Sequence, residues 1–395
     1  MSVSLQLPRA RSLPILAYRF LGAGARFLLA VVLAGSPWLF GAWEMWWFWG
    51  FTALLMLATL LLGVRLCLRP WVPAPAPLAP ALRLLPWWIP FLGYAAVRAC
   101  QADVYMDAER SFLLFLTPLL LAVLLLAGCT SRQRLALLRL VLLNLFLLGV
   151  YGLINHYVCQ SRFVLWEPGY PQYVVEQRAT GSYYCPDHFA GIMELALALG
   201  LGLLLARGRA TVAWRLVAAA TVAVALVAVV LSKSRGGGIA VAALLLAALG
   251  AGFAQWPRAL RWYARILVCA AGVLAIVGAA WAGVGAGYAR RFATEFRVTA
   301  DAGVSGAVAA ARPSYLPALA RKFAETPRGR MYAAAWRAWR TAPWCGIGPG
   351  MHQNLWQHFA PSADGDRATN RWPHPSPHTH SDSRWGRPTS GVPRH

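Results

Sequence analysis

The chain has 395 residues, of which 58% are apolar and only 13% are charged, and its mean hydropathy is +0.50. A soluble protein of this length needs more polar side chains to cover its surface, so the composition excludes the soluble globular class. The composition and the formal net charge of +23 together predict a basic, polytopic membrane protein.

Nine segments are candidates for membrane spans, because a helix needs about 20 mainly apolar residues to cross the hydrocarbon. They are 27–43, 45–64, 84–98, 112–129, 140–158, 188–206, 216–232, 238–254 and 266–288. The third is short and contains Pro86 and Pro90, which predicts a tilted, kinked or re-entrant piece. The first is not a cleavable signal peptide, since a second span follows it without a small-residue cleavage site. The predicted fold is an all-α transmembrane bundle.

The positions of the basic residues predict the orientation, because Lys and Arg accumulate in short cytoplasmic loops. With the N-terminus in the cytoplasm, five cytoplasmic groups hold 16 basic residues and no acid. These are Arg9/Arg11/Arg19/Arg26, Arg65/Arg69/Arg83, Arg132/Arg134/Arg139, Arg207/Arg209/Arg215 and Arg258/Arg261/Arg265. This alternation explains 16 of the 37 Lys and Arg without a nucleic-acid partner.

Four regions follow from these spans. They are a cytoplasmic segment 1–26, a transmembrane domain 27–288, a large extracytoplasmic loop 289–382 and an atypical polar tail 383–395. The residues after Tyr288 carry 15 Lys and Arg against 6 Asp and Glu. An excess of nine positive charges outside the cytoplasm predicts a polyanionic ligand.

The segment Lys233-Ser234-Arg235-Gly236-Gly237-Gly238 is predicted to form an extracytoplasmic hairpin of about six residues. Its two positive charges oppose the positive-inside trend. The planar guanidinium of Arg235 suits phosphate oxygens, and consecutive glycines let backbone N–H groups approach an anion. The alternative is a tight connection whose basic side chains meet lipid phosphates.

A basic helix is predicted over 328–341. Arg330, Arg337 and Arg340 lie within about 80° of one another at about 100° per residue. Such a face fits an anionic substrate, but it equally fits the headgroups of a membrane surface.

Histidines provide candidates for acid–base chemistry. His374, His378 and His380 occupy one irregular loop, and a histidine is a frequent general base. Intervening prolines and the lack of Cys or Glu at ligand spacing argue against a metal site there. Ordinary solvent exposure is the alternative for the loop, and His188, which opens the sixth span, is either a ligand or an interfacial histidine.

The seven cysteines show no metal-binding spacing. Cys159 and Cys185 share one external loop, so they could form a disulfide in an oxidising compartment or remain two separate thiols.

Five segments, in this order and all on the predicted extracytoplasmic side, resemble the O-antigen ligase and polymerase family of membrane glycosyltransferases. They are Gly181–Glu194 (GSYYCPDHFAGIME), 234–238 (SRGGG), Arg330–Trp336 (RMYAAAW), Pro343–Gly350 (PWCGIGPG) and His380-Ser381-Asp382. The resemblance extends from the first span to Asp382.

The resemblance implies a glycosyltransferase C-type fold that moves a glycan from undecaprenyl diphosphate to an acceptor hydroxyl, without a metal or another cofactor. It implies that Arg235 and Arg330 bind the diphosphate and stabilise the leaving group, while His380 orients or deprotonates the acceptor. Further residues expected at this site are Lys233, His188 and Arg337. The implied acceptor is lipid A-core, another glycan or a protein, and the implied location is the bacterial inner membrane with a periplasmic catalytic loop.

The sequence differs from the family pattern in two places. Residues 185–188 read Cys-Pro-Asp-His, where the family commonly has Asn before the His. After Asp382 the family continues into a further span, whereas 383–395 is polar and cannot cross a membrane. A frameshift or a premature end is therefore expected, and such a truncation would impair the enzyme.

Several functions remain compatible with the sequence. Ligation of O-antigen is the first expectation, and a polymerase or a protein O-oligosaccharyltransferase of the same family fits the same motifs. A transporter or a non-catalytic envelope protein is the alternative outside the family. Glu194 is the only acid within a predicted span, which is less than a transporter usually requires.

Overall fold

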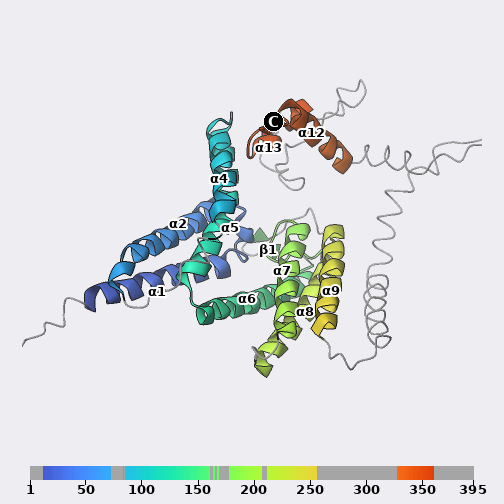
Figure 1. Ribbon diagram of the computed structural model, residues 1–395. Coiled ribbons are helices and arrows are strands. Elements are labelled where there is room, and N and C mark those ends of the chain that lie inside the picture. The colour runs from blue at the N-terminus through green and yellow to red at the C-terminus, as the bar shows by residue number, and fades with distance from the viewer. Residues whose placement is uncertain are drawn as a thin grey trace, which may run out of the picture. The chain divides into compact units, whose positions relative to one another are not determined.

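The computed structural model describes residues 12–72, 83, 85–160, 163–164, 167–168, 178–206, 211–255 and 327–359. These residues form helices and one short antiparallel strand pair, so the all-α prediction is confirmed (Figure 1). The α-helices are α1 (Ser12–Gly35), α2 (Met45–Cys67), α4 (Leu85–Cys100), α5 (Tyr105–Gly128), α6 (Ser131–Val158), α7 (Pro186–Leu205), α8 (Val212–Ser232), α9 (Arg235–Gln255), α12 (Pro327–Thr341) and α13 (Met351–Phe359). The remaining elements are the 3-10 helices η1 (Phe40–Ala42) and η2 (Arg69–Trp71) and the strands β1 (Phe163–Val164) and β2 (Glu167–Pro168).

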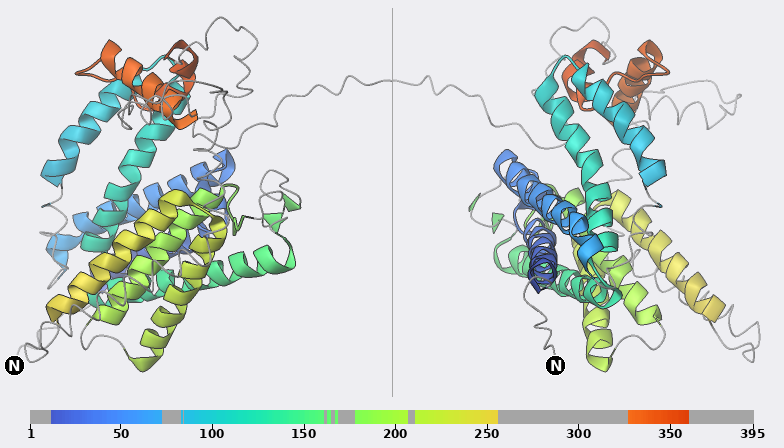
Figure 2. Two further views of the ribbon diagram at one scale, coloured as in Figure 1. Left: turned by 90° about the vertical axis from the view of Figure 1, so that its right-hand side faces the viewer. Right: turned by 60° about the vertical axis from the view of Figure 1, so that its left-hand side comes forward.

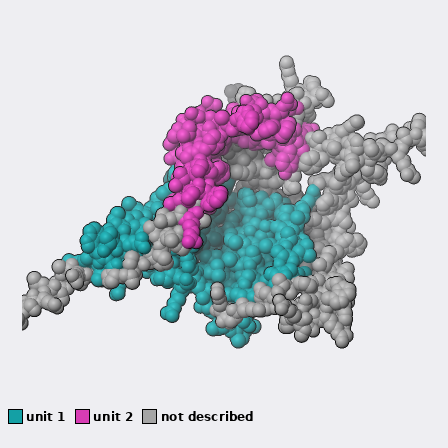
Figure 3. Space-filling view, in the orientation of Figure 1, with its two compact units in different colours: residues 1–77, 124–304 teal, residues 78–123, 305–395 magenta. Residues whose placement is uncertain are grey.

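Two compact units make up the chain (Figure 3). Unit 1 contains residues 1–77 and 124–304, with helices α1, α2 and α6–α9. Unit 2 contains residues 78–123 and 305–395, with helices α4, α12, α13 and most of α5. The division therefore passes through α5, and each unit has its own packed interior.

Six helices among the described residues are long and apolar enough to cross a membrane, which makes the chain a multi-pass membrane protein. They are Leu13–Gly35, Met45–Cys67, Tyr105–Gly128, Ser131–Val158, Pro186–Leu205 and Val212–Ser232. The apolar part of α9, Arg235–Ala251, is shorter. The predicted span 266–288 lies outside the described residues.

The first span starts earlier than the sequence predicts, because α1 runs from Ser12 to Gly35 rather than from 27 to 43. Arg19 and Arg26 lie within it, and their charges lowered the apparent hydropathy of this part. Tyr18, Ala25 and Leu29 are buried at helical spacing, on the side that packs against α2. Packing along one face thus extends the helix through residues that hydropathy alone assigns to a cytoplasmic lead-in.

The third predicted span is α4, a helix of 16 residues with Pro90 inside it. Arg65, near the end of α2, donates a hydrogen bond of 3.1 Å to the backbone oxygen of Gly128 at the end of α5. The C-terminal ends of α2 and α5 therefore lie side by side. Helix α4 is about 24 Å long, which is less than the usual hydrocarbon thickness.

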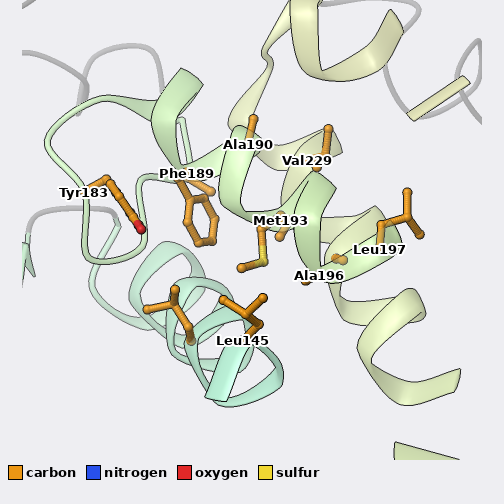
Figure 4. Packing of buried hydrophobic residues seen from close by; sticks show 12 residues of the cluster. Leu145, Tyr183, Phe189, Ala190, Met193, Ala196, Leu197 and Val229 are labelled. Atoms are coloured by element: carbon orange, nitrogen blue, oxygen red, sulfur yellow. The ribbon is translucent and has the colours of Figure 1, made fainter. Parts of the chain in front are cut away.

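The interior of unit 1 lies between α6, α7 and α8, with α9 packed against α7 (Figures 1 and 2). Phe189 and Met193 of α7 are fully buried and point toward Leu145 of α6 (Figure 4). A Cβ atom on Gly152 would come within 2.3 Å of the Phe189 ring, so glycine is required where α6 approaches α7. This packing fixes the beginning of α7, next to which the candidate site lies.

Candidate functional site

The connection between α8 and α9 is much shorter than the predicted six-residue hairpin. Helix α8 ends at Ser232 and α9 begins at Arg235, so only Lys233 and Ser234 separate them. Lys233 has a left-handed backbone, with φ of 51° and ψ of 31°, which ends α8. The Ser234 hydroxyl accepts a hydrogen bond of 3.2 Å from the Gly237 backbone N–H, so Ser234 caps the new helix.

The segment Lys233–Gly238 is therefore the start of a helix as well as a turn, and we call it the basic turn. The unsatisfied N–H groups at a helix N-terminus carry partial positive charge and favour anions. Arg235 adds a half-buried guanidinium at the first helical position. Backbone and side chain therefore create a positive potential at the same place, which suits a phosphate-bearing ligand.

The three glycines of the basic turn have different roles. A Cβ on Gly237 would lie 3.1 Å from side-chain atoms of Ala190 and Val229, so Gly237 allows α9 to pack closely against α7 and α8. A Cβ on Gly236 or Gly238 would have no atom within 4 Å, and both residues are exposed. Packing therefore explains one glycine, while the other two leave the backbone of the first turn open.

Arg178 holds the basic turn in place, and the sequence analysis did not identify it. Its Nε donates a hydrogen bond of 2.7 Å to the backbone oxygen of Ser232, and its Nη2 forms a 2.8 Å ion pair with Asp187 Oδ1. The side chain of Arg178 is 10% exposed and that of Asp187 is 35% exposed. A nearby backbone hydrogen bond of 3.0 Å joins Ala179 to the oxygen of Leu231.

These contacts connect the end of α8 to the beginning of α7. The Ser232 oxygen is one of the carbonyls that a helix C-terminus leaves without an internal partner, and Arg178 satisfies it with a charged donor. Asp187 lies in the first turn of α7, where a negative charge is favoured. A signal in the sequence was available, since Asp187 lies within the GSYYCPDH segment and Arg178 lies three residues before it, but their pairing depends on how the loop folds back.

His188 follows Asp187 on α7 and is exposed. Its ring lies 6.1 Å from the ring of Trp43, measured between centroids. Unit 1 thus contains Lys233, Arg235 and His188 of the predicted site residues, with Arg178 and Asp187 as additions.

The neighbouring loop has buried polar groups that stay neutral. Burial raises the pKa of the Tyr183 hydroxyl and that of the Cys185 thiol above their usual ranges. Cys159 and Cys185 are both free thiols, so the possible disulfide between them does not form in this structure. A buried thiol with a raised pKa is a poor nucleophile.

Unit 2 contains Arg330 and Arg337, both on α12. Arg330 is half-buried, whereas Arg337 is exposed. His380 lies outside the described residues, and so do His374 and His378. Among the residues that the structure describes, no group of three or more His, Cys, Asp or Glu could hold a metal ion.

The Gly-rich segment Pro343–Gly350, which the sequence flags as a motif, forms a turn that docks on α4 and α5 of unit 2. We call it the glycine turn. Arg98 donates a hydrogen bond of 2.8 Å to the backbone oxygen of Gly346, and the Tyr94 hydroxyl donates one to the oxygen of Cys345. Glycine is required here because Gly346, Gly348 and Gly350 all have positive φ, between 59° and 105°.

The glycine turn leads into α13, whose Met351 is buried against Ala99 and Ala108. Asn354 donates a hydrogen bond of 2.9 Å to Asp107 Oδ2. His352 is partly enclosed, and burial lowers the pKa of its imidazole below the usual value. This turn is therefore attached to the end of α4 and the beginning of α5 by side chains from three helices.

Comparisons with known proteins give one match. No curated protein and no solved structure matches the chain. Residues 219–383 match the model of a family described as O-antigen ligase. The matched segment includes the basic turn, α12, the glycine turn and His380-Ser381-Asp382. Over this segment, which is 165 of the 395 residues, the chain is similar to the O-antigen ligase family.

Proposed function

We propose that this protein transfers a glycan from an undecaprenyl-diphosphate carrier to an acceptor hydroxyl, and that the acceptor is lipid A-core. The reaction would take place at the periplasmic face of the bacterial inner membrane and would need no metal. The family match supports glycan transfer of the ligase or polymerase kind. The alternation of basic loops supports the orientation, with the basic turn outside the cytoplasm.

The basic turn is the observation that carries this proposal. In the reaction the acceptor oxygen attacks the anomeric carbon of the first sugar, and the bond from that carbon to the diphosphate oxygen breaks. Negative charge then develops on the departing undecaprenyl diphosphate. A guanidinium at a helix N-terminus, where backbone N–H groups also point outward, is suited to stabilise that charge.

The proposed roles follow from this chemistry. Arg235 and Arg330 bind the diphosphate, with Lys233 as a further cation, and His380 accepts the proton of the acceptor hydroxyl. His188 and Arg337 are assigned accessory positions. A lipid diphosphate is already a good leaving group, so electrostatic stabilisation of its charge is the main requirement.

The test uses the full chain in proteoliposomes with an undecaprenyl-diphosphate-linked glycan and lipid A-core. Arg235→Ala is expected to reduce transfer by about 10²–10³-fold, the usual effect of removing one such donor. Arg215→Ala is the matched control, because it removes an exposed arginine from the other end of the α8 region. Near-normal transfer by the Arg235 variant would remove this residue from the mechanism.

The same assay distinguishes acceptors within the family. Products attached to lipid A-core indicate ligation, whereas lengthening of the carrier-linked glycan indicates a polymerase. Glycosylation of an added protein acceptor indicates a protein O-oligosaccharyltransferase. His380→Ala, assayed in parallel, is expected to abolish transfer while membrane insertion is retained.

A further inference from the structure

Three aromatic side chains form an exposed ridge along α12, which we call the aromatic ridge. Tyr332 is 66% exposed, Trp336 59% and Trp339 48%. Offsets of four and three residues place them within about 60° of one another around the helix. The rings of Trp336 and Trp339 lie 4.7 Å apart between centroids, with 32° between their planes. A contiguous exposed patch of this kind marks an interaction surface.

The other sides of α12 have a different character. Ala334 and Ala338 are buried, and α12 packs against α13. Arg337 and Arg340 are exposed and occupy the flank between the aromatic ridge and the alanine face. Helix α12 contains no Leu, Ile or Val. Its exposed surface therefore consists of amphipathic aromatic rings next to positive charge.

The attachment of α12 within unit 2 determines where this surface lies along the membrane normal. Helix α12 is followed by the glycine turn, which Tyr94 and Arg98 hold at the end of α4. The chain then enters α13, whose Met351 is buried next to Ala108 in the first turn of α5. Since α5 is a membrane span that begins at Tyr105, α12 is attached where the hydrocarbon gives way to the headgroups.

We propose that the aromatic ridge of α12 lies in the phospholipid headgroup region of the leaflet at which α5 begins, with Arg337 and Arg340 contacting lipid phosphates. Trp and Tyr combine an apolar ring with a polar group, and they concentrate in this region of membrane proteins. Arginines beside them complement the negative charge of anionic lipids. A helix with Trp on one face and Arg on its flank matches an interfacial helix rather than a spanning one.

This inference concerns the bilayer and not the donor, and it gives Arg337 a lipid contact as an alternative to its accessory position in the proposed reaction. It also separates the arginines of α12 by position. Arg330 is half-buried at the beginning of the helix, whereas Arg337 and Arg340 face outward on the flank. The lipid-facing role applies only to the last two.

The experiment uses the full chain in vesicles of phosphatidylcholine with and without phosphatidylglycerol. The photoreactive residue p-benzoylphenylalanine replaces Trp336 (Trp336→p-benzoylphenylalanine), and adducts are identified by mass after illumination. The matched control carries the probe at Thr341, which is exposed on the same helix about 140° around from Trp336. Equal membrane insertion and equal thermal midpoints establish that the two proteins are folded alike.

A phospholipid adduct at position 336 and little or none at position 341 is the expected result. Each arginine favours an anionic surface by about 1 kcal/mol, so Arg337→Gln with Arg340→Gln should weaken the contact of α12 with phosphatidylglycerol by about 30-fold, measured as a lower yield of phosphatidylglycerol adducts at position 336. Equal lipid adducts at both positions would overturn the proposal. Adducts to an added glycan or to a protein at position 336, in place of lipid, would also overturn it and would identify another occupant.

Discussion

The contacts of Arg178 predict a large effect of removing one buried side chain. Arg178→Ala leaves the Ser232 carbonyl without its charged donor and leaves Asp187 without its ion-pair partner. Loss of one partner from a fully buried pair destabilises a protein by about 3–5 kcal/mol. The Asp187 side chain is 35% exposed, so solvent screens part of the charge that loses its partner, and we expect Arg178→Ala to destabilise the protein by about 2–3 kcal/mol. Arg178→Lys should cost about 1–2 kcal/mol, since one ammonium cannot reproduce the planar fork.

A double-mutant cycle measures the pair directly. The thermal midpoint of the detergent-solubilised full chain is measured at one heating rate, because unfolding of such proteins is commonly irreversible. The variants are Arg178→Ala, Asp187→Ala and the double change. We expect the midpoint shifts of the two single variants to sum to more than the shift of the double variant, as a coupling of about 1–2 kcal/mol requires, with Asp187→Ala milder because the bond to Ser232 remains. Additive effects, or an Arg178→Ala midpoint equal to that of the parent, would refute the reasoning.

Three further predictions concern packing and titration. Gly237→Ala should destabilise the protein by about 1–3 kcal/mol, since its Cβ would lie 3.1 Å from side chains of neighbouring helices. Gly236→Ala, whose Cβ meets no atom within 4 Å, should be neutral or stabilising by up to about 1 kcal/mol, and the thermal midpoints of the two variants distinguish them. Gly350→Ala should destabilise unit 2 by at least about 1 kcal/mol, because the φ of Gly350 is +73° and a Cβ there would come within 2.6 Å of a backbone oxygen of α5. Faster limited proteolysis after α12 is the measurement. Alkylation of Cys185 at neutral pH should be slower than that of the exposed Cys345, since burial raises the pKa of Cys185 and lowers its thiolate fraction. Mass spectrometry should show the alkylation rate of Cys185 rising as pH increases, and equal rates for the two cysteines would contradict the burial of Cys185.

Composition and local pattern predict six of the membrane helices among the described residues, because a spanning helix pairs its own backbone groups and is recognised by its hydropathy. The start of α1 was missed because Arg19 and Arg26 interrupt that signal, while the packed face through Tyr18 and Ala25 depends on α2. The glycines after Ser234 suggested a loop. They begin a helix instead, because the serine hydroxyl caps it and Gly237 permits close packing.

The residues of the candidate site also differ in how far the sequence predicts them: some lie in local motifs, and others depend on contacts between distant parts of the chain. Arg235 and Arg330 stand out in the sequence because their motifs are local. Arg178 does not, since its partner Ser232 is 54 residues away and the contact exists only after the loop folds back on α8. His380 stays a prediction, as does its role, because it lies outside the described residues.

The basic turn and the glycine turn are held by the same kind of hydrogen bond. In unit 1, Arg178 donates to the backbone oxygen of Ser232 beside the basic turn, and in unit 2, Arg98 donates to the backbone oxygen of Gly346 within the glycine turn. An arginine outside each motif thus fixes a backbone carbonyl of a turn with a charged hydrogen bond. Catalytic groups act only when held close to their productive geometry. Changes at Arg178 or Arg98 should therefore lower both stability and transfer, whereas a change at Arg235 should lower transfer alone. This contrast distinguishes a residue that positions the site from one that binds the donor.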